Sequence, residues 1–189
     1  MEFNQRKTSR NVTMIDERTI EKISKTKLFN DNKLNDKLFK LHKELLRIAK
    51  NKNDSNEVGI LWNIMTDEYV VERGNDTGIN MRNNTKMMRM LDESYCNSLV
   101  FIHNHPRNSC FSFVDLKSFC DYDALIAMTA VCNDGRIHIM RKEADFNPNT
   151  ISVEYNEYVK RNMSGISNII KNASKLGLLY RCSVTRKGE

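Results

Sequence analysis

The feature that most constrains the fold of this chain is an apolar run that ends in two histidines and a proline, residues 99–106. The Val-Phe-Ile segment at 100–102 favours a β-strand, and the proline cannot donate to a β-ladder, so we predict a buried strand that ends near His105. Side chains two positions apart on a strand point to the same face. His103 and His105 are therefore predicted to lie side by side, where both imidazoles can bind one metal ion.

A helix is predicted to begin after the loop that follows the histidines. Ser112 and Asp115 have the spacing of a capping box, which places Asp115 in the first helical turn with its carboxylate able to point back at the histidines. Two histidines and one carboxylate are the three ligands of a catalytic zinc site, whose fourth position holds water. Ser-x-x-Asp alone is a common structural cap, so the metal interpretation depends on its combination with the histidine pair.

In these residues the sequence resembles the JAMM (MPN-plus) metalloprotease superfamily, and most of all its RadC-like, JAB-domain branch of bacteria and phages, over roughly residues 34–184. The family pattern is an upstream glutamate, then His-x-His-Pro, a short loop and Ser-x-x-Asp. The resemblance implies that His103, His105 and Asp115 bind Zn²⁺ and that Ser112 forms a hydrogen bond near the developing oxyanion. The loop before the serine has six residues here, one fewer than is usual in the family.

The resemblance also calls for a glutamate at the start of a strand that follows the first helix. Leucines with helical spacing predict that helix over residues 34–50, and a strand is predicted over 57–62. Glu57 at the entrance of this strand matches the catalytic glutamate of the family, which accepts a proton from the attacking water and passes it to the leaving amine. A glutamate before an apolar strand is more often a solvated strand end, and Glu68 and Glu72 are alternatives on a more polar segment.

The whole pattern predicts an α/β fold with a mixed β-sheet flanked by helices. The further expected elements are a hairpin strand at 68–71, a turn-rich segment at 73–84, a helix at 85–94, strands at 124–132 and 136–140 joined by a tight turn, a long helix at 151–175 interrupted at Ser164-Gly165, and a last strand at 178–184. The order agrees with the JAB/MPN architecture, related to that of cytidine deaminases, which the resemblance implies.

The ends of the chain are more basic than its middle. We interpret residues 1–30 as a basic N-terminal extension or partner-binding arm with a weak helical pattern, and residues 31–189 as the JAB/MPN-like metalloprotease domain. The net charge of +6, from 30 Lys and Arg against 24 Asp and Glu, can attract nucleic acid or an acidic protein. No basic motif interleaved with aromatic residues supports nucleic-acid binding further.

Hydropathy and cysteine usage bear on the compartment. No apolar run approaches the ~18 residues of a membrane span, and no signal-peptide core follows the N-terminus, so neither membrane insertion nor secretion is expected. Five cysteines without a Cys-x-x-Cys pair favour a reducing, cytoplasmic compartment. Cys110 in the site loop is either a soft ligand or nucleophile or an ordinary buried thiol, and His138 faces either solvent or the site.

From these patterns we expect a zinc-dependent hydrolase of the JAMM type that cleaves a peptide or isopeptide bond. The family includes enzymes that remove ubiquitin-like modifiers, which implies a protein or peptide substrate. One alternative is a non-enzymatic module of the same fold, carried by a phage or mobile element, whose basic tails meet DNA or an assembly partner. Another is an enzyme that acts on nucleic acid, suggested by the charge and by the association of RadC-like proteins with DNA repair.

Overall fold

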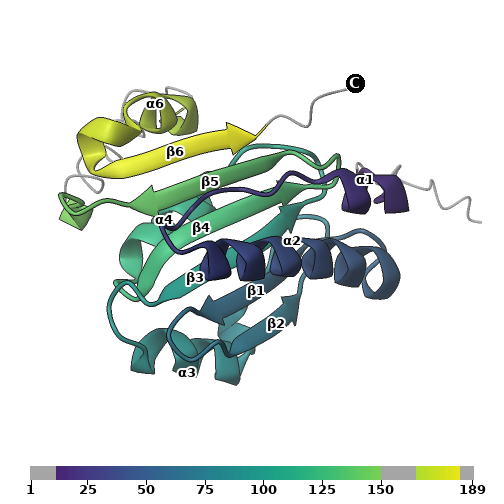
Figure 1. Cartoon of the computed structure of the whole chain (residues 1–189), viewed down its shortest axis with the longest axis horizontal. Coiled ribbons are helices and arrows are strands. Elements are labelled where there is room, and N and C mark those ends of the chain that lie inside the picture. The colour runs from purple at the N-terminus through teal and green to yellow at the C-terminus, as the bar shows by residue number, and fades with distance from the viewer. Residues whose placement is uncertain (1–11, 150–164, 184–189) are drawn as a thin grey trace, which may run out of the picture.

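A six-stranded mixed sheet forms the centre of the computed structural model, which describes residues 12–149 and 165–183 (Figure 1). Its strand order is β2-β1-β3-β4-β5-β6; β3 and β4 are parallel, and the other neighbouring pairs are antiparallel. The strands are β1 (Val58–Asn63), β2 (Tyr69–Arg73), β3 (Leu99–His105), β4 (Leu125–Cys132), β5 (Ile137–Lys142) and β6 (Leu178–Ser183). The predicted α/β class and mixed sheet are confirmed.

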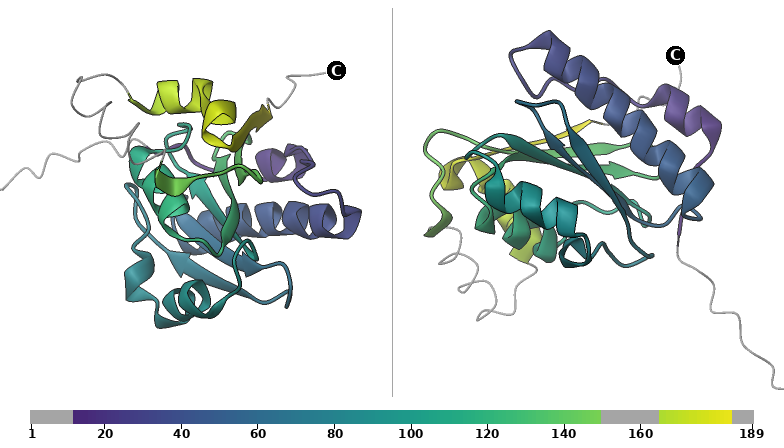
Figure 2. Two further views of the ribbon diagram at one scale, coloured as in Figure 1. Left: turned by 90° about the vertical axis from the view of Figure 1, so that its left-hand side faces the viewer. Right: turned by 90° about the horizontal axis from the view of Figure 1, so that it is seen from below.

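Helices cover both faces of the sheet (Figure 2, right). One face carries α1 (Glu17–Lys22) and α2 (Asn32–Lys52), and the other carries α3 (Thr85–Glu93), α4 (Phe113–Asp121) and α6 (Gly165–Lys171). The described residues also form two short 3₁₀ helices, at Met81–Asn83 and Ala173–Leu176. The long helix predicted over 151–175 is seen only from Gly165 onward, because residues 150–164 lie outside the described residues.

The strand that carries the histidines lies inside the sheet, between β1 and β4, and all seven of its residues are buried. Val100 and Ile102 pack into the layer beneath α2, and Leu99 and Phe101 pack into the layer beneath α3 and α4. A strand covered on both faces needs apolar residues on both, which explains why this stretch is apolar without alternation.

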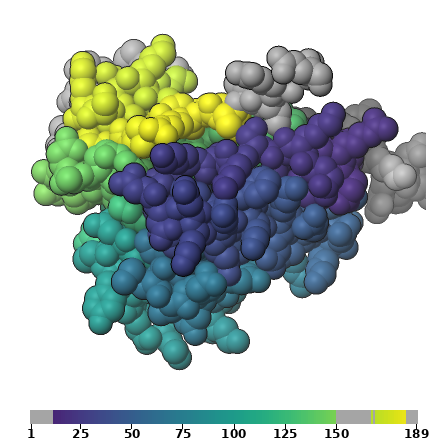
Figure 3. Space-filling view, in the orientation of Figure 1, coloured from purple at the N-terminus to yellow at the C-terminus, as the bar shows by residue number. Residues whose placement is uncertain are grey.

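Much of the predicted N-terminal extension packs against the domain. α1 and the turns around it lie along α2, as the purple and blue surface in Figure 3 shows. Four apolar residues of this segment are buried in the same cluster as α2: Ile15, Ile20, Ile23 and Leu28. The Thr13 N–H donates to the carbonyl of Pro106 at 2.8 Å, so this segment also contacts the loop after the histidines. Residues 1–11 and 184–189, which carry most of the basic side chains near the two termini, lie outside the described residues.

The described helices and the cysteines bear on the expected compartment. Among the described helices, none is both long enough and apolar enough to span a membrane. All five cysteines are free thiols: Cys96, Cys110, Cys120, Cys132 and Cys182.

Candidate metal centre

The register of two antiparallel strands brings the predicted glutamate to the two histidines. Gly59 of β1 lies opposite His103 of β3. Directly opposed residues on antiparallel strands point to the same face, so Glu57, two positions earlier, is carried to the level of His105. Glu57, His103 and His105 are all buried, and each offers one ligand atom within 4.8 Å of the other two.

Asp115 joins this cluster from the first turn of α4. Its Oδ1 lies 3.7 Å from His103 Nε2, and its Oδ2 lies 3.4 Å from His105 Nε2. Ser112 is the N-cap: its hydroxyl oxygen accepts the Asp115 N–H at 3.1 Å, and its own N–H donates to Asp115 Oδ2 at 2.6 Å. The predicted capping box is confirmed, and it fixes the direction of the carboxylate toward the histidines.

Hydrogen bonding settles which nitrogen of His105 is free. Its Nδ1 lies 2.8 Å from the carbonyl oxygen of Ser109, which can only accept, so in the neutral ring Nδ1 carries the hydrogen and Nε2 presents a lone pair. His103 Nε2 lies 2.9 Å from this nitrogen. The other ring nitrogen of His103 is buried without a hydrogen-bond partner among the described residues. Both Nε2 atoms thus point into the space bordered by the carboxylates.

The spacing of these atoms fits the coordination sphere of a first-row divalent metal. A tetrahedral ion with bonds of about 2.0–2.1 Å separates its ligand atoms by about 3.3 Å. The separations between the two Nε2 atoms and from them to the Asp115 oxygens are 2.9, 3.4 and 3.7 Å, which bracket that value. His103, His105 and Asp115 are therefore spaced to hold a metal ion, and Glu57, His103 and His105 form a second group close enough to do so.

The two carboxylates at this centre differ in their ionisation. Burial raises the pKa of the Glu57 carboxyl, although the neighbouring histidines act in the opposite sense. Burial alone would also raise the pKa of Asp115, but the charge and hydrogen bonds of His103 and His105 outweigh it and hold that pKa well below its usual range. Glu57 is therefore disposed to take up a proton and Asp115 to stay ionised.

Comparisons of the chain with models of known protein families, with curated proteins and with solved structures find no match. The JAB/MPN architecture and the JAMM activity therefore stay predictions from the residues of this chain.

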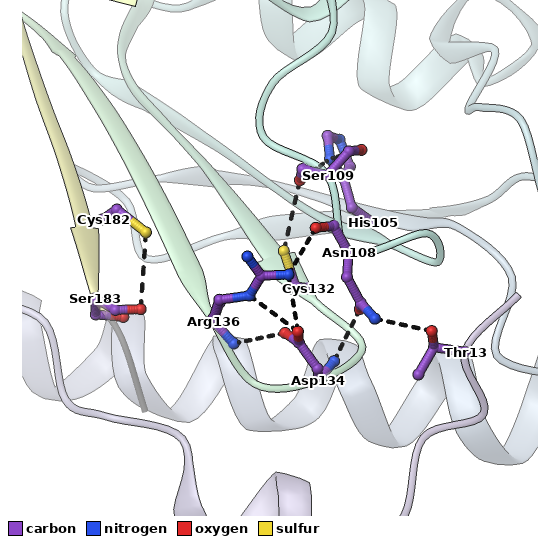
Figure 4. A network of polar contacts seen from close by, with 9 residues as sticks. All are labelled: Thr13, His105, Asn108, Ser109, Cys132, Asp134, Arg136, Cys182 and Ser183. Atoms are coloured by element: carbon purple, nitrogen blue, oxygen red, sulfur yellow. Dashed lines mark hydrogen bonds and ion pairs between the residues drawn. The ribbon is translucent and has the colours of Figure 1, made fainter. Parts of the chain in front are cut away.

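The loop that positions His105 is tied to two distant segments (Figure 4). The Asn108 side chain donates to Thr13 Oγ1 at 2.8 Å and accepts the Asp134 N–H at 3.0 Å. Its carbonyl accepts from the Arg136 guanidinium at 2.9 Å. These bonds join the loop to the N-terminal segment and to the β4–β5 turn. Because Ser109 follows directly, they also hold the carbonyl that orients the His105 ring.

Asn104, between the two histidines, is a site residue that the sequence did not reveal. Its side chain is fully buried on the opposite face of β3. Its Oδ1 accepts the Val58 N–H at 2.7 Å, and its Nδ2 donates to the carbonyl of Asn56 at 3.1 Å and to Asn133 Oδ1 at 2.8 Å. Asn104 thus holds the peptide groups on both sides of Glu57. Strand alternation predicts which face it occupies, but no local pattern identifies partners nearly 50 positions away in the chain.

The other candidates from the sequence lie outside the ligand cluster. Glu68 is exposed, and the Glu72 carboxylate accepts from a neighbouring asparagine side chain at 2.7 Å. His138 is buried with Nδ1 2.8 Å from the Tyr180 hydroxyl, and burial lowers its pKa to about 4. The Cys110 thiol lies 3.5 Å from the same hydroxyl, and burial raises its pKa.

A cleft of about 370 Å³ opens beside the centre. Glu57, His105, Ser112 and Asp115 line it, so all the predicted catalytic and metal-binding residues except the fully buried His103 face one space that a substrate can enter. Its two walls are the segment 76–81 and the first two turns of α4. The serine is exposed at this wall although its hydroxyl oxygen caps the helix.

Proposed function

We propose that the protein is a zinc-dependent hydrolase of the JAMM type, with the JAB/MPN architecture, that cleaves a peptide or isopeptide bond. The observation that carries the proposal is the convergence of Glu57, His103, His105 and Asp115 from three separate segments of the chain into one cluster, of which Glu57, His105 and Asp115 line the cleft. Zinc is the proposed ion because imidazole and carboxylate donors with a position left for water are typical of its hydrolytic sites. His103, His105 and Asp115 are assigned as its ligands.

The remaining groups are assigned from their geometry and ionisation. Zinc, when bound, supplies Lewis acidity that polarises the scissile carbonyl and lowers the pKa of water. Glu57 accepts a proton from the attacking water and delivers it to the leaving amine, a role that its raised pKa suits. Two neighbouring carboxylates whose pKa values are driven apart serve different roles, which supports Asp115 as the ionised ligand. The Ser112 hydroxyl accepts the Asp115 N–H and keeps its own hydrogen to donate to the oxyanion.

The proposed substrate is a protein or peptide, and a conjugate of a ubiquitin-like modifier belongs to the same chemical class. Five free thiols support a reducing compartment, so we place the protein in the cytoplasm.

Metal analysis combined with paired variants tests this function. The purified protein is expected to bind one zinc ion per chain, and His103→Ala to lose it while the matched control His138→Ala retains it. Glu57→Gln should keep zinc and lose at least about 100-fold in hydrolysis of a fluorogenic peptide library and of a ubiquitin-like conjugate. The control Glu68→Gln, at an exposed glutamate outside the cluster, should hydrolyse normally.

Three outcomes would contradict the proposal in different ways. A protein that cannot be loaded with zinc is not a zinc hydrolase. Zinc binding with equal hydrolysis by wild type and Glu57→Gln refutes the assignment of the base. Stoichiometric zinc without hydrolysis of any amide supports the alternative of a binding module, and salt-sensitive DNA binding in that protein supports a role with nucleic acid.

A further inference from the structure

The floor of the cleft continues from the metal centre along β3 into apolar side chains. Phe101 lies two positions before His103 on the same face, and the two rings stack with centroids 5.1 Å apart. Met128 of β4 is paired with Phe101 across the parallel strands and also lines the cleft. The surface next to the histidine ligands is thus made of an aromatic ring and a thioether, both largely buried.

The walls beside this floor are apolar as well. Ile79 and Met81 form one wall, and Val114 and Phe119 of α4 form the other. Val114 is 72% exposed, which makes it one of the few large apolar side chains that the described residues leave open to solvent. Because Val114 lies at the cleft beside Asp115, its exposed side chain is available to contact a substrate.

A glycine allows one wall to close on the floor next to His103. A Cβ atom at Gly59 would lie 2.8 Å from Ile79 Cδ1, closer than such atoms approach, and 3.0 Å from the Phe101 ring, tighter than most such contacts. Gly59 is the residue opposite His103 in the β1–β3 pair. Without a side chain there, Ile79 packs directly on the sheet and extends the apolar surface up to the metal ligands.

The charged side chains among the described lining residues are already engaged. Glu57 and Asp115 belong to the proposed centre, and Asp76 lies 3.5 Å from the Arg107 guanidinium. A charged substrate side chain on the apolar floor would lose water without gaining a partner, whereas an apolar one gains burial. A volume of about 370 Å³ is at the lower end for ligand pockets, so it suits a short extended segment.

We infer that the substrate carries a bulky apolar side chain, of the size of leucine, methionine or phenylalanine, next to the scissile amide, and that Phe101, Met128, Ile79, Met81 and Val114 hold it. This inference rests on the proposed function and narrows its substrate class. A Gly-Gly sequence at the scissile bond, as at the end of a ubiquitin-like modifier, would leave this surface uncovered.

Binding can be measured without turnover. The zinc-loaded Glu57→Gln variant, labelled with ¹³C at its methionine methyl groups, is titrated with hexapeptides that differ only in a central leucine, glycine or aspartate. The Met81 and Met128 signals should shift with the leucine peptide, while that of Met65, which is 73% exposed and outside the cleft, should stay in place. The leucine peptide should bind at least about tenfold more tightly than the glycine peptide.

Variants at one wall of the cleft give the second measurement. In the same background, Met81→Glu should weaken leucine-peptide binding about tenfold or more. Met81→Leu, which restores an apolar side chain, should bind the leucine peptide more tightly than Met81→Glu does. The matched surface control Met65→Glu should leave binding unchanged. Equal binding of the leucine and glycine peptides, or unmoved Met81 and Met128 signals, would overturn the inference. Hydrolysis by the wild-type protein is measured separately. Hydrolysis without a preference for apolar peptides would contradict this inference but not the proposed hydrolase function. An absence of hydrolysis of any amide would contradict the hydrolase function but not the binding preference.

Discussion

Replacing Asn104 by alanine is expected to destabilise the protein by about 3 kcal/mol. The substitution removes three hydrogen bonds made by one fully buried side chain, at 2.7, 3.1 and 2.8 Å. It leaves the Val58 N–H, the Asn56 carbonyl and Asn133 Oδ1 without these partners. A buried polar group left unpaired costs about 1–3 kcal/mol, and carbonyl oxygens tolerate the loss better than N–H groups. For a chain of this length, about 3 kcal/mol corresponds to a fall in Tm of about 6–12 °C.

The effect should reach the proposed centre because two of these bonds flank Glu57. Asn104→Ala is expected to keep zinc, because the proposed ligands are His103, His105 and Asp115, and to lose hydrolytic rate through misplacement of the proposed base. Urea unfolding followed by circular dichroism measures the stability. Thr66→Ala, which removes one exposed turn hydrogen bond of 3.3 Å, serves as the control and should change stability by less than about 0.5 kcal/mol. An Asn104→Ala midpoint equal to that of wild type would refute the reasoning.

Two more predictions concern a buried base and a helix cap. His42 is buried, its Nε2 lies 3.0 Å from Thr129 Oγ1, and burial lowers its pKa from 6.5 to about 3. Below pH 6.5 the unfolded chain therefore binds a proton at His42 that the folded protein does not bind. The contribution of His42 to the free energy of unfolding is complete above pH 6.5 and falls as the pH decreases, by up to about 1.4 kcal/mol per pH unit. His42→Gln should reduce the slope of unfolding free energy between pH 6 and 4 by that amount, and an unchanged slope contradicts the assignment. Ser112→Ala should cost about 1 kcal/mol because the Asp115 N–H loses its cap, and it should keep zinc because the backbone N–H that holds the Asp115 carboxylate remains. Ser112→Thr keeps the cap, and equal unfolding midpoints for all three proteins would show that the cap contributes nothing.

Local sequence was sufficient where the determining interactions span few residues. The buried strand ending at His105 and the capping box of Ser112 and Asp115 follow from strand propensity, a proline and a three-residue spacing, and each is confirmed. The helix predicted over 34–50 appears as α2, because its apolar stripe repeats with the period of the helix it forms. The weak helical pattern predicted within residues 1–30 appears as α1, but local reasoning did not predict the burial of this segment's apolar side chains, for which α2 and the sheet provide the surface.

The assembly of the site was beyond the sequence alone. Family resemblance pointed to Glu57, but it is the register of β1 against β3 that brings it level with His105. Asn104 shows the same limit, since its amide could be predicted to face away from the histidines but not to hold the backbone beside Glu57.

The chain itself determined that two imidazoles would lie side by side and that Asp115 would be held in a capped helical turn, because residues two apart on a strand and three apart at a helix start have fixed relative positions. Only the tertiary structure decided what surrounds them: Glu57, the Asn104 side chain that holds the backbone on both sides of Glu57, and the apolar cleft between Phe101 and Val114. Those groups come from segments far apart in the chain, and their approach is set by sheet pairing and core packing, which no short pattern of residues encodes.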